Sequence, residues 1–263
     1  MKERIISAVI ALLITVPLVL LGGVYFDILV IVLGLLGVRE MINAKGNIPN
    51  LMRYISYVLF VILIVNNFEL VGTTFSINIE LVILSIISLF LPLIMYHDDK
   101  KYNIIDALYL FATVIFLSIA FNLFVIVRDN GIMLTLYLFL ITITTDTFAY
   151  IGGSKFGKNK LAPTISPKKS VEGFFIGLIF GTIIPVLVYY FCINSSINIL
   201  ILILITALLS VIGQFGDLIF SSIKRHFGVK DFSNLMPGHG GVLDRLDSII
   251  FVLYAYMILS SLI

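Results

Sequence analysis

Long apolar runs divide this sequence, and they constrain its fold more than any other feature. The runs cover residues 5–22, 27–43, 54–67, 79–96, 105–127, 131–152, 173–192, 198–220 and 248–263. A transmembrane helix needs roughly 20 mostly apolar residues, because the hydrocarbon core of a bilayer is about 30 Å thick. Helices also satisfy their own backbone hydrogen bonds, which lipid cannot do. We therefore predict an all-α, polytopic integral membrane protein with about nine transmembrane helices.

The composition excludes a soluble globular protein. Apolar residues make up 60% of the chain and charged residues only 12%, whereas soluble domains carry about 25% charged residues. No basic stripe exists outside the loops between apolar runs, so we expect no nucleic-acid partner. The single cysteine, Cys192, excludes an internal disulfide framework. No Ala-x-Ala site follows the first apolar run, which we interpret as a retained helix rather than a signal peptide.

The placement of basic residues predicts the orientation of the chain. Nine spans with an internal N-terminus give the inner loops 1–4, 44–53, 97–104, 153–172 and 221–247. Of the 17 Lys and Arg residues, all except Arg128 lie in these loops or, for Arg39, at the inner end of the second span. Cytoplasmic loops of membrane proteins carry such an excess of positive charge. We therefore predict a protein of the cell membrane with its N-terminus and polar loops in the cytoplasm.

The two halves of the chain differ in polarity. We expect one transmembrane helical domain over 1–263, in which 1–130 is mainly scaffold and 131–263 carries the active site. In the scaffold half, we interpret Arg39 and Glu40 as an ion pair. In the second half, glycines recur every four residues at 173, 177 and 181. That spacing predicts close helix packing, either within the chain or between subunits.

A polar insert interrupts the apolar runs near the C-terminus, from Gly216 to Asp247. Its carboxylates and cations are interleaved, and the helical spacing i, i+4, i+7 and i+8 predicts one shared face for Asp217, Ser221, Lys224 and Arg225. Charges at a membrane boundary are costly unless they hold an ion or a charged substrate. This insert therefore predicts a metal-assisted phosphate site.

Further polar residues precede the insert. Asp146 lies inside an apolar span, which indicates a functional carboxylate, with a structural hydrogen bond to a neighbouring helix as the alternative. Pro167 ends one element, and Ser166 or Ser170 could cap the helix that follows. A helix start directs N–H groups and positive dipole toward an anion. Lysines at 168 and 169, beside such a start, would suit a triphosphate.

The polar insert also resembles a known family. The pattern Ser221-x-Ile223-Lys224-Arg225, then Lys230-Asp231-x-Ser233, then Pro237-x-His239-Gly240-Gly241-x-x-Asp244-Arg245-x-Asp247 is similar to the signature of CDP-diacylglycerol synthases, also called phosphatidate cytidylyltransferases. The match covers 221–247 without a gap, and Met236 is a mild departure from it. The segment 166–173 and the stretch Asp146-x-Phe148-Ala149-Tyr150 are similar to a second region of that family.

The resemblance implies a reaction and its partners. A member of this family transfers CMP from CTP to phosphatidic acid in the membrane lipid, which yields CDP-diacylglycerol and pyrophosphate. The resemblance also implies Mg²⁺ as cofactor, with a second, monovalent cation as an open alternative, and a homodimer. Mg²⁺ prefers carboxylates together with phosphates and waters. We therefore expect Asp217, Asp244 and Asp247 to be its ligands.

Roles for the remaining residues follow from the same resemblance. We assign catalytic roles to Asp217, Lys224, Arg225, Asp244, Arg245 and Asp247, and substrate-binding roles to Asp146, Lys168, Lys169, Glu172, Ser221, Ser222, Lys230, His239, Gly240 and Gly241. The cations would hold phosphate oxygens and the charge on the leaving pyrophosphate. His239 would either donate to phosphate or hold the turn. The two glycines would let the backbone approach a phosphate.

Two other classes of membrane protein would also place carboxylates among apolar runs. A transporter or channel could use them as a cation path, but basic residues are interleaved with them on one side. A CDP-alcohol phosphotransferase would carry the pattern Asp-Gly-x-x-Ala-Arg…Gly-x-x-x-Asp-x-x-x-Asp, which does not occur in this sequence. A purely structural membrane protein would have no use for so many charges near the membrane.

Overall fold

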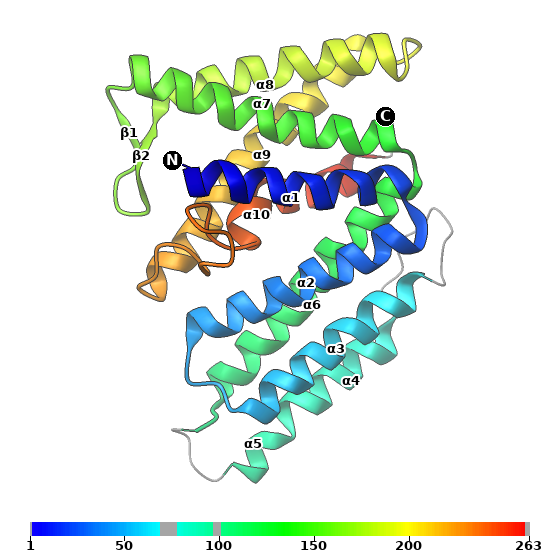
Figure 1. Ribbon diagram of the computed structural model, residues 1–263, viewed down its shortest axis with the longest axis vertical. Coiled ribbons are helices and arrows are strands. Elements are labelled where there is room, and N and C mark those ends of the chain that lie inside the picture. Colours follow the sequence, from blue (N-terminus) through cyan, green and yellow to red (C-terminus); the bar gives the residue numbers. More distant parts are fainter. Residues whose placement is uncertain (1, 69–77, 97–100, 261–263) are drawn as a thin grey trace. The chain divides into compact units, whose positions relative to one another are not determined.

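The computed structural model describes residues 2–68, 78–96 and 101–260, and they are mostly helical (Figure 1). The helices are α1 (Lys2–Leu21), α2 (Gly23–Lys45), α3 (Asn50–Phe68), α4 (Ile79–Phe90), α5 (Pro92–Met95), α6 (Ile104–Asp129), α7 (Ile132–Phe156), α8 (Val171–Cys192), α9 (Ile199–His226) and α10 (Leu243–Leu259). Each predicted apolar run therefore coincides with helix within these residues. The run 79–96 is divided at Pro92, and the last three residues of 248–263 lie outside the described residues.

Several of these helices have the length and composition of membrane spans. Among the described residues, four are long and apolar enough to cross a membrane, namely α6, α7, α8 and α9. Shorter apolar helical stretches cover Val9–Leu21, Asn50–Asn66 and Ile79–Met95. The architecture is that of a helical membrane protein, and the total of nine spans stays a prediction.

The all-α prediction overlooked one element. Between α7 and α8, strands β1 (Lys160–Ala162) and β2 (Ser166–Ser170) form an antiparallel hairpin with an irregular register. Strands of three and five residues are too short to show a clear alternating pattern. Pro167 lies within β2, and a two-stranded hairpin tolerates proline because each strand has an open edge.

The chain divides into two compact units, which we describe separately. The first unit comprises Met1–Asn130 together with Asp231–Asp244, and the second comprises Gly131–Lys230 together with Arg245–Ile263. We call Asp231–Asp244 the Gly-Gly loop. This part of the polar insert groups with the first half of the chain, although the sequence assigns it to the second. The division of 1–263 into a scaffold part and a part that carries the active site stays a prediction.

In the first unit, α6 is the central helix. It packs against α2, α3 and α4, and much of its surface is buried (Figure 1). Phe60 of α3 meets Phe121 of α6 edge to face, with ring centroids 6.1 Å apart. Gly34 of α2 leaves the space that the Phe60 ring fills. These contacts hold α2 against the core of the unit.

The C-terminal end of α2 is fixed by polar contacts to α6. Lys45 forms an ion pair with Asp106 at 2.7 Å, and the Tyr109 hydroxyl donates to the Met41 carbonyl at 2.8 Å. Asp106 also completes a capping box with Asn103 at the start of α6. The last turns of α2 therefore have a defined position within the first unit.

In the second unit, α7 and α8 lie side by side, with the hairpin at their shared end (Figure 1). The glycine spacing of α8 explains how closely they approach. A Cβ atom at Gly173 would lie 2.6 Å from the Ala149 carbonyl oxygen, and one at Gly177 would lie 2.8 Å from the Thr145 carbonyl oxygen. The prediction of close packing is confirmed within the chain, and α9 then packs against α8.

Candidate active site

Five charged side chains of the second unit interact with one another, and we call them the acid–lysine cluster. They are Asp146 of α7, Lys169 of β2, Asp217 and Lys224 of α9, and Asp247 of α10. Separate segments of the chain therefore contribute to one charged site. All five residues are among those assigned from the sequence.

The shortest contact in the cluster joins β2 to α9. Lys169 Nζ lies 2.7 Å from Asp217 Oδ2 and also donates to the Gln214 carbonyl at 3.4 Å. On the other side of the carboxylate, the Ser221 hydroxyl donates to Asp217 Oδ1 at 3.2 Å. Residues 217 and 221 therefore share a helix face, as their i, i+4 spacing predicted. Lys169 anchors the hairpin to that face.

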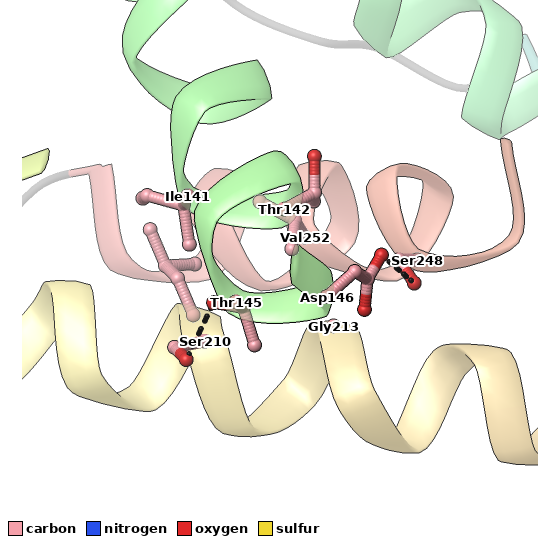
Figure 2. A pocket seen from close by; sticks show the side chains of 9 residues that line it. Ile141, Thr142, Thr145, Asp146, Ser210, Gly213, Ser248 and Val252 are labelled. Carbon is pink, nitrogen blue, oxygen red and sulfur yellow. Dashed lines mark hydrogen bonds between the residues drawn. The ribbon is translucent and has the colours of Figure 1, made fainter. Parts of the chain in front are cut away.

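Asp146 joins the cluster from α7. The Ser248 hydroxyl donates to its Oδ2 at 3.4 Å, and Figure 2 shows the two side chains pointing toward each other. One residue earlier, the Thr145 hydroxyl hydrogen-bonds to that of Ser210 at 2.8 Å. The carboxylate of Asp146 is attracted by Lys169 and repelled by Asp217. Asp146 thus forms the hydrogen bond to a neighbouring helix that one alternative predicted, while its functional role stays a prediction.

Asp247 adds a third carboxylate from α10. It is repelled by Asp217 and Asp146 and attracted by Lys224, and its Oδ1 accepts the Ser248 N–H at 2.8 Å. Lys224 is only 7% exposed, and a lysine so deeply buried needs a charged or polar partner. Three acidic side chains and two lysines therefore lie in one site, and the carboxylates repel one another.

The predicted metal ligands are only partly brought together by what the structure describes. Asp217 and Asp247 interact within the second unit, and Asp146 is their third acidic neighbour there. Asp244 belongs to the first unit. Among the described residues, no three His, Cys, Asp or Glu side chains already stand close enough to hold one metal ion. The ligand set of Asp217, Asp244 and Asp247 stays a prediction.

The remaining basic candidates are mostly exposed. This description applies to Lys168, Arg225, Lys230 and Arg245, and also to Ser222. The sequence run ended at residue 220, but α9 continues to His226 and keeps Arg225 helical. Its Nε donates to the Ile165 carbonyl at 3.3 Å, and its Nη1 donates to the Val229 carbonyl at 2.9 Å. Arg225 thus ties the hairpin turn to the end of α9.

The start of α8 differs from an open anion site. Ser170 caps it by accepting the Gly173 N–H at 3.1 Å, which confirms one of the two predicted caps. Glu172 accepts the backbone N–H groups of Lys158 and Asn159 at 3.0–3.2 Å. These contacts give Glu172 a local role in closing the segment before β1. A direct contact of Glu172 with substrate stays a prediction.

In the first unit, the Gly-Gly loop is closed by its own backbone. The N–H groups of His239 and Gly240 both donate to the Met236 carbonyl, at 2.8 and 3.1 Å. The His239 ring hydrogen-bonds through Nδ1 to the Ser7 hydroxyl of α1 at 2.9 Å. Of the two roles considered for His239, holding the turn is the one these contacts support.

Asp244 also has a structural role in this loop. Its Oδ2 accepts the Phe232 N–H at 2.8 Å and the Gly241 N–H at 2.9 Å. Gly240 has a φ of 85°, and a Cβ atom there would lie 2.7 Å from the same oxygen. In this structure, Gly240 therefore makes room for the Asp244 carboxylate. The expected approach of a phosphate to these glycines stays a prediction.

Glu40 of α2 makes contacts that the sequence did not predict. It is 3% exposed and accepts hydrogen bonds from the Ser233 hydroxyl at 2.7 Å, the Val242 N–H at 2.8 Å and the Leu243 N–H at 2.9 Å. Arg39 and Glu40, both described residues, form no ion pair, so that interpretation was wrong. The available signal was a carboxylate inside an apolar span.

Comparisons with known proteins extend this picture to the whole chain. A family model described as the cytidylyltransferase family matches residues 2–263. The phosphatidate cytidylyltransferase of Staphylococcus haemolyticus (strain JCSC1435) is 39% identical over 257 residues, which cover 96% of each chain. Proteins with the same name from Staphylococcus aureus (strain COL) and Staphylococcus epidermidis (strain ATCC 35984) are 36% and 37% identical over 261 residues, again 96% of each chain. The similarity therefore extends far beyond the polar insert.

Proposed function

Because this chain belongs to the cytidylyltransferase family and is therefore a nucleotidyltransferase, we propose that it transfers CMP from CTP to phosphatidic acid. The products are CDP-diacylglycerol and pyrophosphate, a step of phospholipid biosynthesis. The observation that carries the proposal is the acid–lysine cluster, since carboxylates interleaved with lysines suit two phosphate-bearing substrates. The names of the relatives supply the choice of substrates.

The reaction needs no covalent intermediate on the protein. A phosphate oxygen of phosphatidic acid attacks the α-phosphorus of CTP, and the bond from that phosphorus to the β-phosphate oxygen breaks. Both substrates are anions, so their repulsion must be offset at the site. Lys169 and Lys224 carry positive charge beside the carboxylates. We assign them to phosphate oxygens, where they would stabilise the charge that develops on pyrophosphate.

The same cluster has the chemistry to hold Mg²⁺. Its carboxylates repel one another, and Mg²⁺ prefers carboxylate and phosphate oxygens. Lys169 now neutralises one Asp217 oxygen, which is a place that a metal cation could take. We propose Asp217 and Asp247 as ligands, with Asp146 or Asp244 completing the set. Bound Mg²⁺ would neutralise phosphate charge and polarise the phosphoryl group.

Exposed cations would receive the nucleotide from water. We propose that Lys168 and Arg225, at the hairpin, contact the triphosphate, and that Lys230 and Arg245 contribute phosphate contacts from the ends of the Gly-Gly loop. CTP is soluble and phosphatidic acid is a lipid. A site at the cytoplasmic boundary of the membrane would receive both, which agrees with the distribution of basic residues in the sequence.

The test is a reconstituted transfer reaction. Purified full-length protein in detergent is incubated with radiolabelled CTP, phosphatidic acid and Mg²⁺, and labelled CDP-diacylglycerol and pyrophosphate are quantified. Diacylglycerol, which lacks the attacking phosphate, replaces phosphatidic acid as the matched control. We expect equal amounts of the two products, and no transfer with diacylglycerol or after chelation of Mg²⁺.

Two outcomes would contradict this proposal. Transfer to phosphatidic acid that persists in Asp217→Asn at wild-type rate would remove the acid–lysine cluster from catalysis. CTP hydrolysis without a lipid product would show a different acceptor.

The same preparations also test the proposed second cation, by exchange of K⁺ for Na⁺ or choline, and the proposed homodimer, by light scattering.

A further inference from the structure

We propose that Glu40 is a positioning residue, whose carboxylate holds the Gly-Gly loop and the start of α10 in the arrangement that CMP transfer requires. The inference rests on the proposed function for its catalytic part, while the structural part stands independently. Glu40 is 3% exposed and lies in the half of the chain that the sequence marked as scaffold. A buried carboxylate is costly unless each oxygen has hydrogen-bond partners.

The three hydrogen bonds of Glu40 connect the two ends of the loop. Ser233 lies near its beginning, whereas Val242 and Leu243 lie at its end, and Leu243 is the first residue of α10. The first N–H groups of a helix have no partner within the helix. Glu40 supplies that partner from α2, and its negative charge lies at the positive end of the α10 dipole. One side chain therefore holds both ends of the loop and the first residue of α10.

Gly241 provides independent support for a specific role of Glu40. Its backbone does not adopt the left-handed region, so alanine would be tolerated on conformational grounds. The three atoms nearest to the position that a Cβ atom would take at Gly241 are nevertheless all carboxylate atoms of Glu40. The glycine is therefore required because Glu40 occupies the space. The second glycine of the His-Gly-Gly motif is explained by a residue about two hundred positions earlier.

The position of Glu40 is itself well defined. One residue later, the Met41 carbonyl accepts the Tyr109 hydroxyl, and one turn further Lys45 pairs with Asp106. Glu40 thus projects from a helix end that α6 holds in place. It also occupies the amides of Val242 and Leu243, so these two N–H groups are not available to a phosphate.

Hydrogen exchange tests the structural part in the full-length protein. We compare wild type with Glu40→Gln and with Ser233→Ala, and follow exchange in peptides covering the Gly-Gly loop and Val242–Leu243. Glu40→Gln should exchange these amides at least about tenfold faster, because the charged acceptor is lost. Ser233→Ala should produce a smaller increase, since it removes one of three bonds. Glu80→Gln, at an exposed carboxylate in the first turn of α4, is the matched control and should change nothing.

Steady-state kinetics test the positioning part. In Glu40→Gln we expect kcat to fall by about tenfold or more while the KM for CTP changes less than about threefold, because the loss lies in arrangement rather than in a substrate contact. Faster exchange with an unchanged kcat would overturn the positioning role. Unchanged exchange at Val242 and Leu243 would overturn the whole inference. A wild-type protein without CMP transfer would refute only the proposed function, because the exchange result would stand.

A double-mutant cycle covers the case in which Glu40→Gln folds poorly. Gly241→Ala should lower Tm strongly in the wild-type background and little or not at all in the Glu40→Ala background, because the side chain that collides is absent. Additive losses of Tm would show that Gly241 and Glu40 are not coupled, and would overturn the inference by a second route.

Discussion

The ammonium group of Lys169 lies 2.7 Å from Asp217 Oδ2, so a proposed phosphate ligand neutralises a proposed metal ligand. The two proposed binding events would therefore be linked, because Mg²⁺ and Lys169 would compete for the same carboxylate. The hairpin strand β2 carries this lysine to α9. Binding of CTP at the hairpin would draw the lysine toward phosphate and free the carboxylate for the metal.

This linkage predicts opposite effects of Lys169→Gln on two ligands. Without the competing ammonium group, Mg²⁺ should stabilise the protein at about fivefold lower concentration in the absence of CTP, a factor that corresponds to roughly 1 kcal/mol. The KM for CTP should rise. Thermal melts across a Mg²⁺ titration measure the first effect. Lys168→Gln, at the exposed neighbour, should raise the KM for CTP and leave the Mg²⁺ midpoint unchanged; equal midpoints in both variants would count against the competition.

A second prediction separates two roles of Asp244. The amide oxygen of Asp244→Asn can still accept the Phe232 and Gly241 N–H groups, but the negative charge is lost. We expect nearly unchanged hydrogen exchange in the Gly-Gly loop and a loss of CMP transfer of about a hundredfold or more, as for a metal ligand. If the exchange stays unchanged and turnover is normal at ordinary Mg²⁺, Asp244 is a loop residue and not a ligand.

A third prediction concerns the packing of α7 on α8. Gly173→Ala should destabilise the protein by about 1–3 kcal/mol, because its new methyl group would lie against the Ala149 carbonyl oxygen, which cannot move aside. Gly152→Ala collides instead with the Ile176 side chain, at its Cβ atom and at two atoms beyond it. Thermal unfolding in detergent should show that Ile176→Ala restores part of the stability lost in Gly152→Ala, because alanine removes the two outer atoms and keeps the Cβ. Since the Gly173 neighbour is backbone, no such rescue by Ile176→Ala is expected there.

A fourth prediction concerns the one basic residue that the sequence placed outside. The Arg128 guanidinium donates to the Val19 and Leu20 carbonyls, at 2.6 and 3.0 Å, and so caps the end of α1. Arg128→Ala should lower stability by about 1–3 kcal/mol and leave kcat of the folded enzyme unchanged. Arg128→Lys should recover only part of the loss, because an ammonium group cannot reproduce the planar pair of guanidinium N–H groups that reaches both carbonyls. Full recovery by lysine would attribute the effect to charge alone.

The helices could be predicted from the sequence because apolar runs of this length have few alternatives in a membrane. Asp146 was identifiable for a related reason, since a carboxylate inside an apolar span is conspicuous. The hairpin was not, because its strands are too short for periodicity and contain Pro167. The apolar run of α9 ends at residue 220, but the helical spacing through Arg225 predicted that the helix continues, and it ends at His226.

Long-range contacts account for the rest of what the sequence did not reveal. Glu40 caps a helix whose first residue, Leu243, lies 203 positions away. Nothing in the sequence around either residue predicts this contact. The family resemblance suggested Asp244 as a metal ligand, but it did not reveal that this carboxylate accepts hydrogen bonds from Phe232 and Gly241. Residue spacing predicts which side chains are neighbours on one helix, whereas contacts between distant segments can be identified only from the three-dimensional structure.

The Gly-Gly loop belongs to the first unit, and this has a consequence for expressing the protein as two fragments. The chain leaves the second unit after Lys230 and returns to it at Arg245, so a cut after Asn130 would separate the loop from Glu40. We expect fragments 1–130 and 131–263 to be inactive when expressed alone and to regain activity by complementation when expressed together. In such a split protein, the buried Glu40 of one fragment must bind the loop of the other, so the recovered activity would measure reassembly.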